Sequence, residues 1–166
     1  MAHNQNTSRH PSLVELDRMY AELVAQAEKL RDSFFEAALA LTARQGKKGH
    51  VPICISVKSA SPNSCSFLWM TIALKAGEGG KKREQDFTTI DKGPGNKYSV
   101  SQFKFVKGPL NGLVRNYECK LAEIREACSV IMTIRRSLSA AVKRAEKAHE
   151  SIDAFIIENY PKGDAS

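Results

Sequence analysis

The chain has 166 residues, of which 42% are hydrophobic and 26% are charged, and its formal net charge is +7. This composition is typical of one globular domain and excludes a disordered chain. No apolar stretch approaches the roughly 20 residues that span a membrane, and the polar N-terminus lacks the apolar core of a secretory signal. We therefore expect a cytoplasmic protein without a membrane partner, and we interpret residues 1–11 as a flexible tail.

Residues 12–45 are predicted to form one long helix. Its apolar residues alternate between spacings of three and four, which is the heptad pattern of a helix that packs on another helix. Ser12 and Glu15 have the spacing of a capping box at the start, and Gly46 follows the last turn. The apolar stripe comprises Leu13, Leu16, Tyr20, Leu23, Ala27, Leu30 and Phe34.

Residues 50–107 are predicted to form a four-stranded antiparallel sheet. Runs rich in β-branched and aromatic residues are separated by turn residues, and they cover 51–57, 65–74, 86–90 and 97–105. The short links favour a meander. The fourth run alternates apolar and polar residues, with a register slip at Ser101–Gln102. Its aromatic residues and Trp69 have base stacking as an alternative role, but a hydrophobic sheet face covered by helices is the preferred interpretation.

Residues 109–158 are predicted to form a second and longer helix. Pro109 suits the first helical position, and a heptad seam follows in which Arg135 and His149 replace apolar residues. At 1.5 Å per residue the helices are about 50 and 75 Å long, so the second extends past the first. This leaves an apolar group without a partner, formed by Ile152, Phe155 and Ile156. We expect a homodimer through these residues; the alternative is that the last turns fold back on the same chain.

These elements predict a single α+β domain over residues 12–158, followed by a tail at 159–166. The two long helices lie antiparallel and are coiled-coil-like, and the four-stranded sheet is inserted at one end of them.

Positive charge is concentrated between Arg44 and Lys120. This range holds fourteen Lys or Arg and five Asp or Glu, a net charge of +9, whereas the rest of the chain sums to −2. Such a cluster favours a polyanion, and DNA is the first choice because its phosphates bind clustered cations through counterion release. The turn GEGGKKREQ at 77–85 is expected to contact phosphates. The predicted DNA-binding residues are Lys81, Lys82, Arg83, Lys47, Lys48, Lys92, Lys97, Lys104 and Lys107.

Two other roles for the basic residues stay open. Lysines at a sheet edge prevent edge-to-edge association, and this purely structural role needs no ligand. The basic sheet is also suited to an acidic protein, in which case the molecule is a coiled-coil adaptor of a mobile element or phage. A gel-shift assay at low salt separates the adaptor from the DNA-binding protein.

The sequence shows no arrangement of residues typical of an enzyme. The cysteines are not paired in a C-x-x-C motif, and the histidines are scattered, so we expect buried free thiols and no metal or other cofactor. A small nuclease or nucleotide-modifying enzyme is a third hypothesis. Asp86, Asp91 and His50 are too few to argue for its metal site.

The order of elements and two short stretches resemble a known family. GNKYS at 95–99 precedes the last predicted strand, and NYECKLAEIR at 116–125 opens the long helix. With the Trp-containing strand and the Gly/Lys turn, they resemble the conjugative mobilisation proteins called MobI over roughly residues 13–148. The resemblance implies an auxiliary factor of DNA transfer that binds the origin of transfer and assists the relaxase without cutting DNA. It implies no particular site residues.

Overall fold

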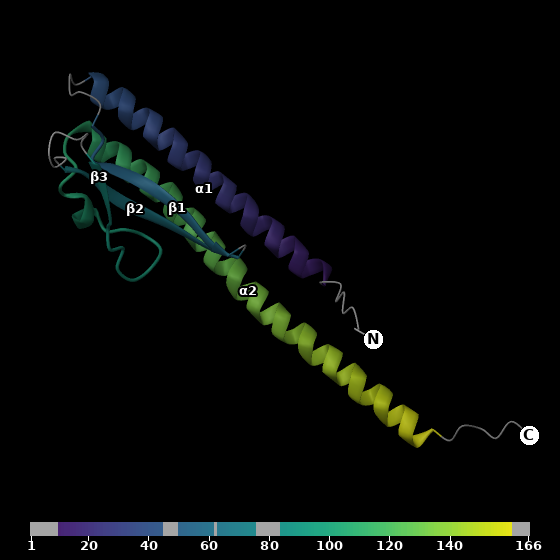
Figure 1. The fold of residues 1–166 in the computed structure, drawn as a ribbon. Coiled ribbons are helices and arrows are strands. Elements are labelled where there is room, and N and C mark those ends of the chain that lie inside the picture. Colours follow the sequence, from purple (N-terminus) through teal and green to yellow (C-terminus); the bar gives the residue numbers. More distant parts are fainter. Residues whose placement is uncertain (1–9, 45–49, 62, 76–83, 161–166) are drawn as a thin grey trace, which may run out of the picture.

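Two long helices packed side by side form the frame of the molecule. The computed structural model describes residues 10–44, 50–61, 63–75 and 84–160. Helices α1 (Pro11–Arg44) and α2 (Pro109–Asn159) run in opposite directions, and a three-stranded antiparallel sheet lies against them at one end (Figure 1). The predicted α+β class and the two packed helices are confirmed.

The predicted heptad stripe is the buried face of α1. Tyr20, Ala27 and Phe34 lie seven residues apart and are buried, and the leucines between them are partly buried. The predicted Ser12–Glu15 capping box is wrong, because the helix already begins at Pro11. The cap is His10, whose ring Nδ1 accepts a hydrogen bond from the Ser12 backbone N–H at 3.3 Å.

Helix α2 is one unbroken helix of 51 residues. Its first part packs on α1 through the predicted seam, where the buried side chains are Leu121, Ile124, Cys128 and Ile131. Arg135 also lies on this seam, and its Nε donates a hydrogen bond to Asp17 Oδ1 of α1 at 2.5 Å. The polar seam position is therefore satisfied by an ion pair between the two helices.

The last part of α2 continues beyond the start of α1 (Figure 1). We call residues 140–159 the α2 extension; among them only Val142 is partly buried. The alternative in which these turns fold back on the chain is wrong, because the helix continues to Asn159. Neither helix of the described part is both long and apolar enough to cross a membrane.

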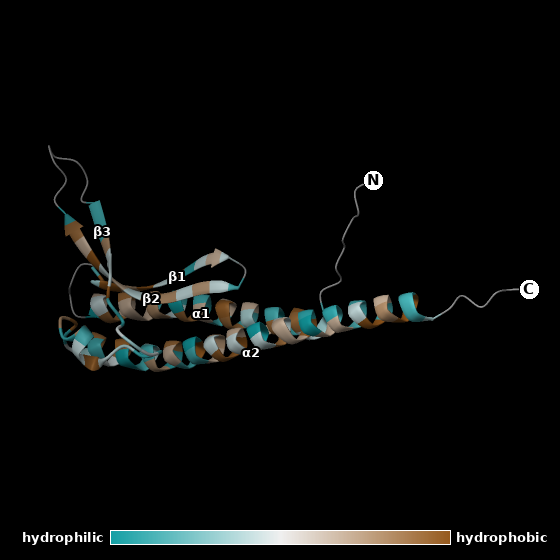
Figure 2. Cartoon of the chain, turned by 90° about the horizontal axis from the view of Figure 1, so that it is seen from below, coloured by the Kyte–Doolittle hydropathy of each residue, from teal (hydrophilic) through white to brown (hydrophobic). Residues whose placement is uncertain are grey.

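The sheet is a meander of β1 (Ile53–Ser61), β2 (Ser64–Lys75) and β3 (Glu84–Thr89), with β2 in the centre. Neighbouring strands are antiparallel, as predicted. Ile55 lies opposite Trp69 on the neighbouring strand, and Val57 lies opposite Phe67, so apolar side chains pair across β1 and β2. Figure 2 shows the sheet lying along one side of the helix pair.

Trp69 is the centre of the core. Its side chain is fully buried, and its ring meets Phe34 of α1 edge-on with 4.9 Å between ring centroids. Phe103 contacts the indole in a second edge-on arrangement at 5.6 Å. The indole N–H donates to a carboxylate oxygen of Glu118 on α2 at 2.7 Å. One side chain thus joins the sheet to both helices, and the preferred interpretation of Trp69 as a core residue is confirmed.

The predicted fourth strand at 97–105 is wrong. This segment is a loop that contains a short 3₁₀ helix, η2 (Val100–Phe103). Gln102 Oε1 accepts the Ser99 backbone N–H at 2.6 Å, which caps the turn locally. The Tyr98 backbone N–H donates to Glu118 Oε1 at 2.8 Å, where a strand would donate to its neighbour. Two of the four alternating apolar residues, Val100 and Phe105, are consequently exposed.

Candidate nucleic-acid interface

A loop rich in lysine connects β3 to α2. We call residues 91–107 the basic loop; it carries four of the nine residues predicted to bind DNA. Lys97, Lys104 and Lys107 are exposed and form no ion pair with any described residue. Lys92 is partly buried, and its Nζ donates to the Gly95 carbonyl within the loop. Three of these four lysines are therefore available to a ligand.

Hydrogen bonds hold the basic loop in one conformation. Asp91 Oδ1 accepts the Gly93 backbone N–H at 3.0 Å, and Gln102 Nε2 donates to the Asp91 carbonyl. At the other end, Asn111 Nδ2 donates to the carbonyls of Phe103 at 3.2 Å and Val106 at 3.0 Å. The loop is therefore tied both to itself and to the first turn of α2, which orders its lysines before any ligand binds.

A buried ion pair on α2 fastens the loop to the sheet. Arg125 and Glu118 are one heptad apart and almost wholly buried, and two hydrogen bonds of 2.9 and 3.1 Å join them. Arg125 Nε also donates to the Phe67 carbonyl of β2, and its Nη1 donates to the Asn96 carbonyl of the basic loop, each at 2.9 Å. The guanidinium thus bridges a helix, a strand and a loop.

The buried polar side chains around this ion pair all have hydrogen-bond partners. Glu118 accepts hydrogen bonds from Arg125, from the Trp69 indole and from the Tyr98 backbone. Burial raises the pKa of the Tyr98 phenol, so the hydroxyl stays protonated at neutral pH and donates to the Ile90 carbonyl at 3.3 Å. No buried side-chain nitrogen or oxygen of the described residues lacks a hydrogen-bond partner. A fully satisfied network of this kind fixes a conformation.

Sequence analysis missed this network. In the sequence Glu118 is one of five acids within the basic region, and Arg125 lies just outside that region. The available signal is their spacing of seven residues, which places both on the same side of a helix facing a Trp-containing strand. That spacing is common in helices with no buried pair, so it does not identify one.

Outside the basic loop, some of the described cations form ion pairs and others do not. Lys75 is paired with Asp86 on the neighbouring strand, with 2.7 Å between Nζ and Oδ2, and Lys120 is paired with Glu123 at 2.9 Å. Lys58 and Arg115 are exposed and have no ion pair with a described residue. Lys97 and Arg115 line one hollow of about 150 Å³, so the free cations of the loop continue onto α2.

A larger hollow of about 340 Å³ lies between β2, the basic loop and α2. Its lining includes the cationic side chains of Lys92, Arg125 and Arg136 and no Asp or Glu. Glu118 already neutralises Arg125, so Lys92 and Arg136 supply its excess positive charge. The hollow therefore favours an anionic group over a cationic one.

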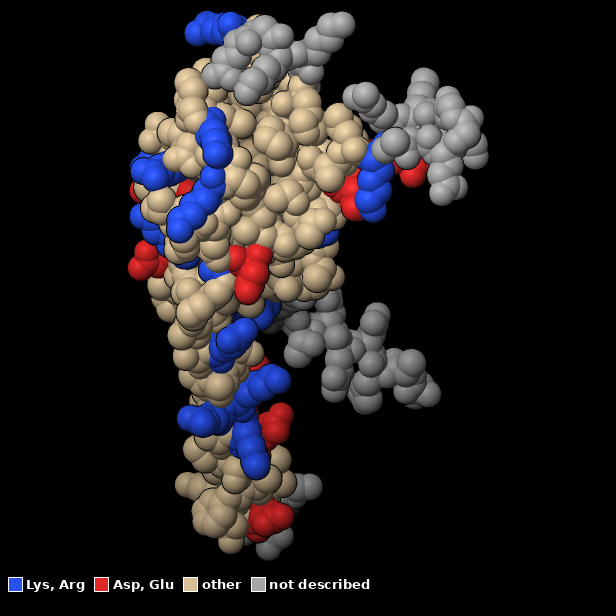
Figure 3. Space-filling view, turned by 90° about the vertical axis from the view of Figure 1, so that its left-hand side faces the viewer, with Lys and Arg blue, Asp and Glu red and all other residues tan. Residues whose placement is uncertain are grey.

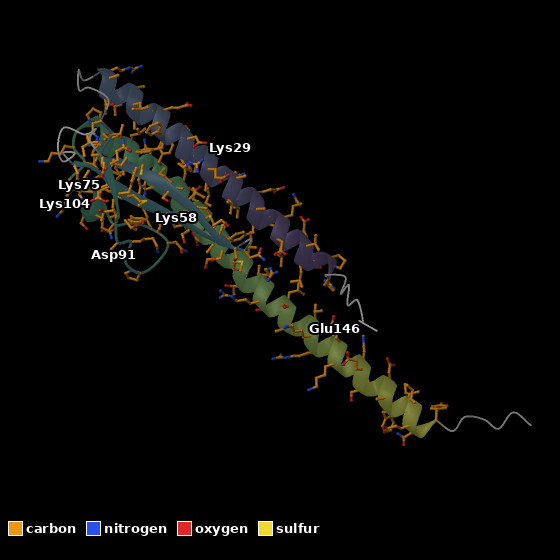
Figure 4. The ribbon with its side chains drawn as sticks, in the orientation of Figure 1. Lys29, Lys58, Lys75, Asp91, Lys104 and Glu146 are labelled. Carbon is orange, nitrogen blue, oxygen red and sulfur yellow. The ribbon has the colours of Figure 1, made fainter. Side chains whose placement is uncertain are left out.

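The positive charge is not confined to one end of the molecule. Figure 3 shows Lys and Arg side chains over the wide part of the molecule and again along its narrow part. In Figure 4, Lys75 and Lys104 lie near one end of the sheet, and Lys58 lies nearer the α2 extension. On the α2 extension, acidic residues such as Glu146 stand among the cations in the sequence. Lys97, Lys104 and Lys107 of the basic loop, in contrast, form no ion pair with a described residue.

Five of the nine predicted DNA-binding residues lie outside the described residues: Lys47, Lys48, Lys81, Lys82 and Arg83. The strands on either side of the last three pair as far as Lys75 and Glu84. Residues 75 and 84, between which these three cations lie in the sequence, are therefore neighbours on adjacent strands. They lie at the end of β2 that is opposite to the β1–β2 turn. The predicted dimer residues Ile152, Phe155 and Ile156 are exposed on α2.

The four cysteines are free thiols, but the prediction that they are buried is wrong for all except Cys128. Cys119 is exposed, whereas burial raises the pKa of Cys128 to about 11. Because the thiolate is the reactive form, we expect iodoacetamide at neutral pH to modify Cys119 first and Cys128 last in the folded protein. Labelling of Cys128 should increase as the pH approaches 11. Peptide mass spectrometry measures each rate, and equal rates for the two thiols in the folded protein would contradict this assignment.

The fold and the site together define a class of protein: a small α+β protein in which a helix pair supports a sheet and an ordered basic loop. A family model described as MobI protein matches residues 23–139, more than half of the chain, and the chain belongs to this mobilisation-related family. The match covers the sheet, the basic loop and most of the paired part of the helices, without the first twelve residues of α1, and it ends where the α2 extension begins. No curated protein and no solved structure matches the chain.

Proposed function

We propose that this protein is a DNA-binding accessory factor of conjugative transfer, which binds the origin-of-transfer region and assists the relaxase. The observation that carries the proposal is the ordered basic loop with three exposed, unpaired lysines, in a region whose net charge is +9. Membership of a mobilisation-related family supports the choice of DNA over other polyanions. The protein itself has no catalytic role in this proposal.

The loop is suited to phosphate contacts in particular. Its hydrogen bonds and the Arg125 bridge order the backbone in the free protein, so little conformational entropy is lost when Lys97, Lys104 and Lys107 bind phosphates. Lys81, Lys82 and Arg83 extend the same basic region in the sequence. Phosphate contacts supply affinity and register, and they leave sequence specificity to other residues.

A salt titration of DNA binding tests the proposal. The combined Lys97→Ala, Lys104→Ala and Lys107→Ala variant should bind duplex DNA about tenfold or more weakly at low salt, and the slope of log affinity against log salt should fall by about three. The combined Lys81→Ala, Lys82→Ala and Arg83→Ala variant should behave in the same way. Fluorescence anisotropy with origin-of-transfer duplex and an unrelated duplex measures both quantities.

A matched control removes the same number of charges elsewhere. Arg18, Lys29 and Arg31 lie on α1, outside the basic region, so their combined replacement by Ala should change the salt slope little. An equal loss in this control would contradict a DNA site at the basic loop. Failure of the unaltered protein to bind any DNA at low salt would instead favour the adaptor with an acidic partner.

A further inference from the structure

One side of the α2 extension is apolar from Ala141 to Phe155. The residues on it follow a heptad spacing of four, three, four and three: Ala141, Ala145, Ala148, Ile152 and Phe155. Ile152 is 55% exposed and Phe155 is 65% exposed, and Ile156 beside them is 46% exposed. No described part of the chain covers this side. Apolar residues in such a row are typical of a helix that packs on another helix.

Charge along the extension is divided into a basic half and an acidic half. The half nearer α1 contains Lys143, Arg144 and Lys147 together with Glu146, and the half nearer the C-terminus contains Glu150, Asp153 and Glu158. Two copies aligned antiparallel place the basic half of each against the acidic half of the other. Parallel copies would place like charges together, which costs energy. The charge pattern therefore favours an antiparallel second copy.

The sizes of the apolar residues fit the same arrangement. The small residues, Ala145 and Ala148, lie nearer α1, and the large ones, Ile152 and Phe155, lie nearer the C-terminus. In an antiparallel pair centred between Ala148 and Ile152, each alanine faces a large side chain of the second copy. Alternation of small and large residues lets two helices interdigitate without voids.

The available length also fits. The extension spans about 30 Å at 1.5 Å per residue. Pro11 at the start of α1 lies beside Ile134 and Leu138 of α2, so α1 occupies the apolar face of α2 up to that point. A second α2 extension aligned in this register ends close to the first residue of α1. The second copy therefore covers the α2 extension along its length without displacing α1.

We propose that two copies of this chain pair through their α2 extensions, antiparallel and in the register that places Ala148 opposite Ile152 of the second copy. A two-fold axis then passes near the middle of the extension, and the two sheets with their basic loops lie at opposite ends of the dimer. Arg144 of each copy lies beside Glu158 of the other.

Sedimentation equilibrium of the full chain without DNA tests the pairing. The unaltered protein should be a concentration-dependent dimer. Ile152→Glu places two unpaired carboxylates in the interface, so the dissociation constant should rise by about a hundredfold. The matched control is Ile157→Glu, because Ile157 is 79% exposed and lies on the opposite side of the same helix. It should change the dissociation constant by less than about threefold.

Charge reversal tests the antiparallel register. Arg144→Glu and Glu158→Arg should each weaken the dimer by about tenfold, because each disrupts two symmetric ion pairs. The two changes together should restore the dissociation constant. These residues are exposed, so circular dichroism should show unchanged helix content in every variant. A monomer at all concentrations, equal effects of Ile152→Glu and Ile157→Glu, or no rescue by the double reversal would overturn the proposal. None of these measurements depends on DNA binding.

Discussion

Replacing Arg125 with methionine is expected to lower the free energy of unfolding by about 3–5 kcal/mol. The change leaves the Glu118 carboxylate buried without its cationic partner, which is more costly than the loss of an exposed ion pair. It also removes the donors to the Phe67 and Asn96 carbonyls, so the basic loop loses its connection to α2. Urea unfolding followed by circular dichroism, together with the fluorescence of the single tryptophan, measures the loss.

Two further variants separate the buried charge from general effects of mutation. Arg18 forms an exposed ion pair with Glu15, so Arg18→Met should cost no more than about 1 kcal/mol. Adding Glu118→Gln to Arg125→Met removes the uncompensated charge and keeps an acceptor for the indole N–H, so the double variant should be more stable than Arg125→Met alone. A loss for Arg125→Met as small as that for Arg18→Met would contradict the structural role of the network.

Replacing Trp69 with alanine is expected to cost about 3–5 kcal/mol of the free energy of unfolding. The indole fills the space between Phe34 and Phe103, and its removal leaves a cavity where the sheet meets both helices. It also removes one of the two donors to Glu118 Oε2, which keeps only its hydrogen bond from Arg125. Far-ultraviolet circular dichroism in urea provides the measurement, because this variant has no tryptophan.

The control for Trp69 is an aromatic residue on the same sheet. Phe87 on β3 is 49% exposed, so Phe87→Ala should cost no more than about 1 kcal/mol. Trp69→Phe retains much of the packing volume and loses the hydrogen bond, so its stability should lie between those of the unaltered protein and Trp69→Ala. Similar losses for Trp69→Ala and Phe87→Ala would show that the indole is not the centre of the core.

The buried network connects the core to the proposed function. Arg125 and Glu118 lie in the core of the helix–sheet contact, yet the Asn96 carbonyl and the Tyr98 backbone that they bind belong to the basic loop. The loop presents its lysines in a fixed arrangement because the buried ion pair of Arg125 and Glu118 forms hydrogen bonds to the loop backbone. Substitutions of Arg125 or Glu118 should therefore disturb the conformation of the basic loop, whereas substitutions of its lysines should remove phosphate contacts. Only the lysine variants should change the slope of log affinity against log salt.

Local patterns in the sequence determine the helices and three of the strands. The heptad spacing from Leu13 to Phe34 predicts the buried face of α1, because side chains three and four residues apart lie on one side of a helix. The concentration of charge likewise predicts that Lys97, Lys104 and Lys107 belong to a basic surface, since cations remain solvated unless they are paired. The excess length of α2 and its exposed apolar end follow from counting residues.

Only the tertiary structure determined the conformation of residues 97–105 and the ion pair between Glu118 and Arg125. Alternating apolar residues favour a strand, but a strand also needs a neighbour to accept its backbone N–H groups. Here the Tyr98 N–H reaches Glu118, whose carboxylate is brought there by the packing of α2 on the sheet. A side chain distant in sequence thus replaces the neighbouring strand. Local periodicity carries no information about such a partner, because it depends on where the helix lies in three dimensions.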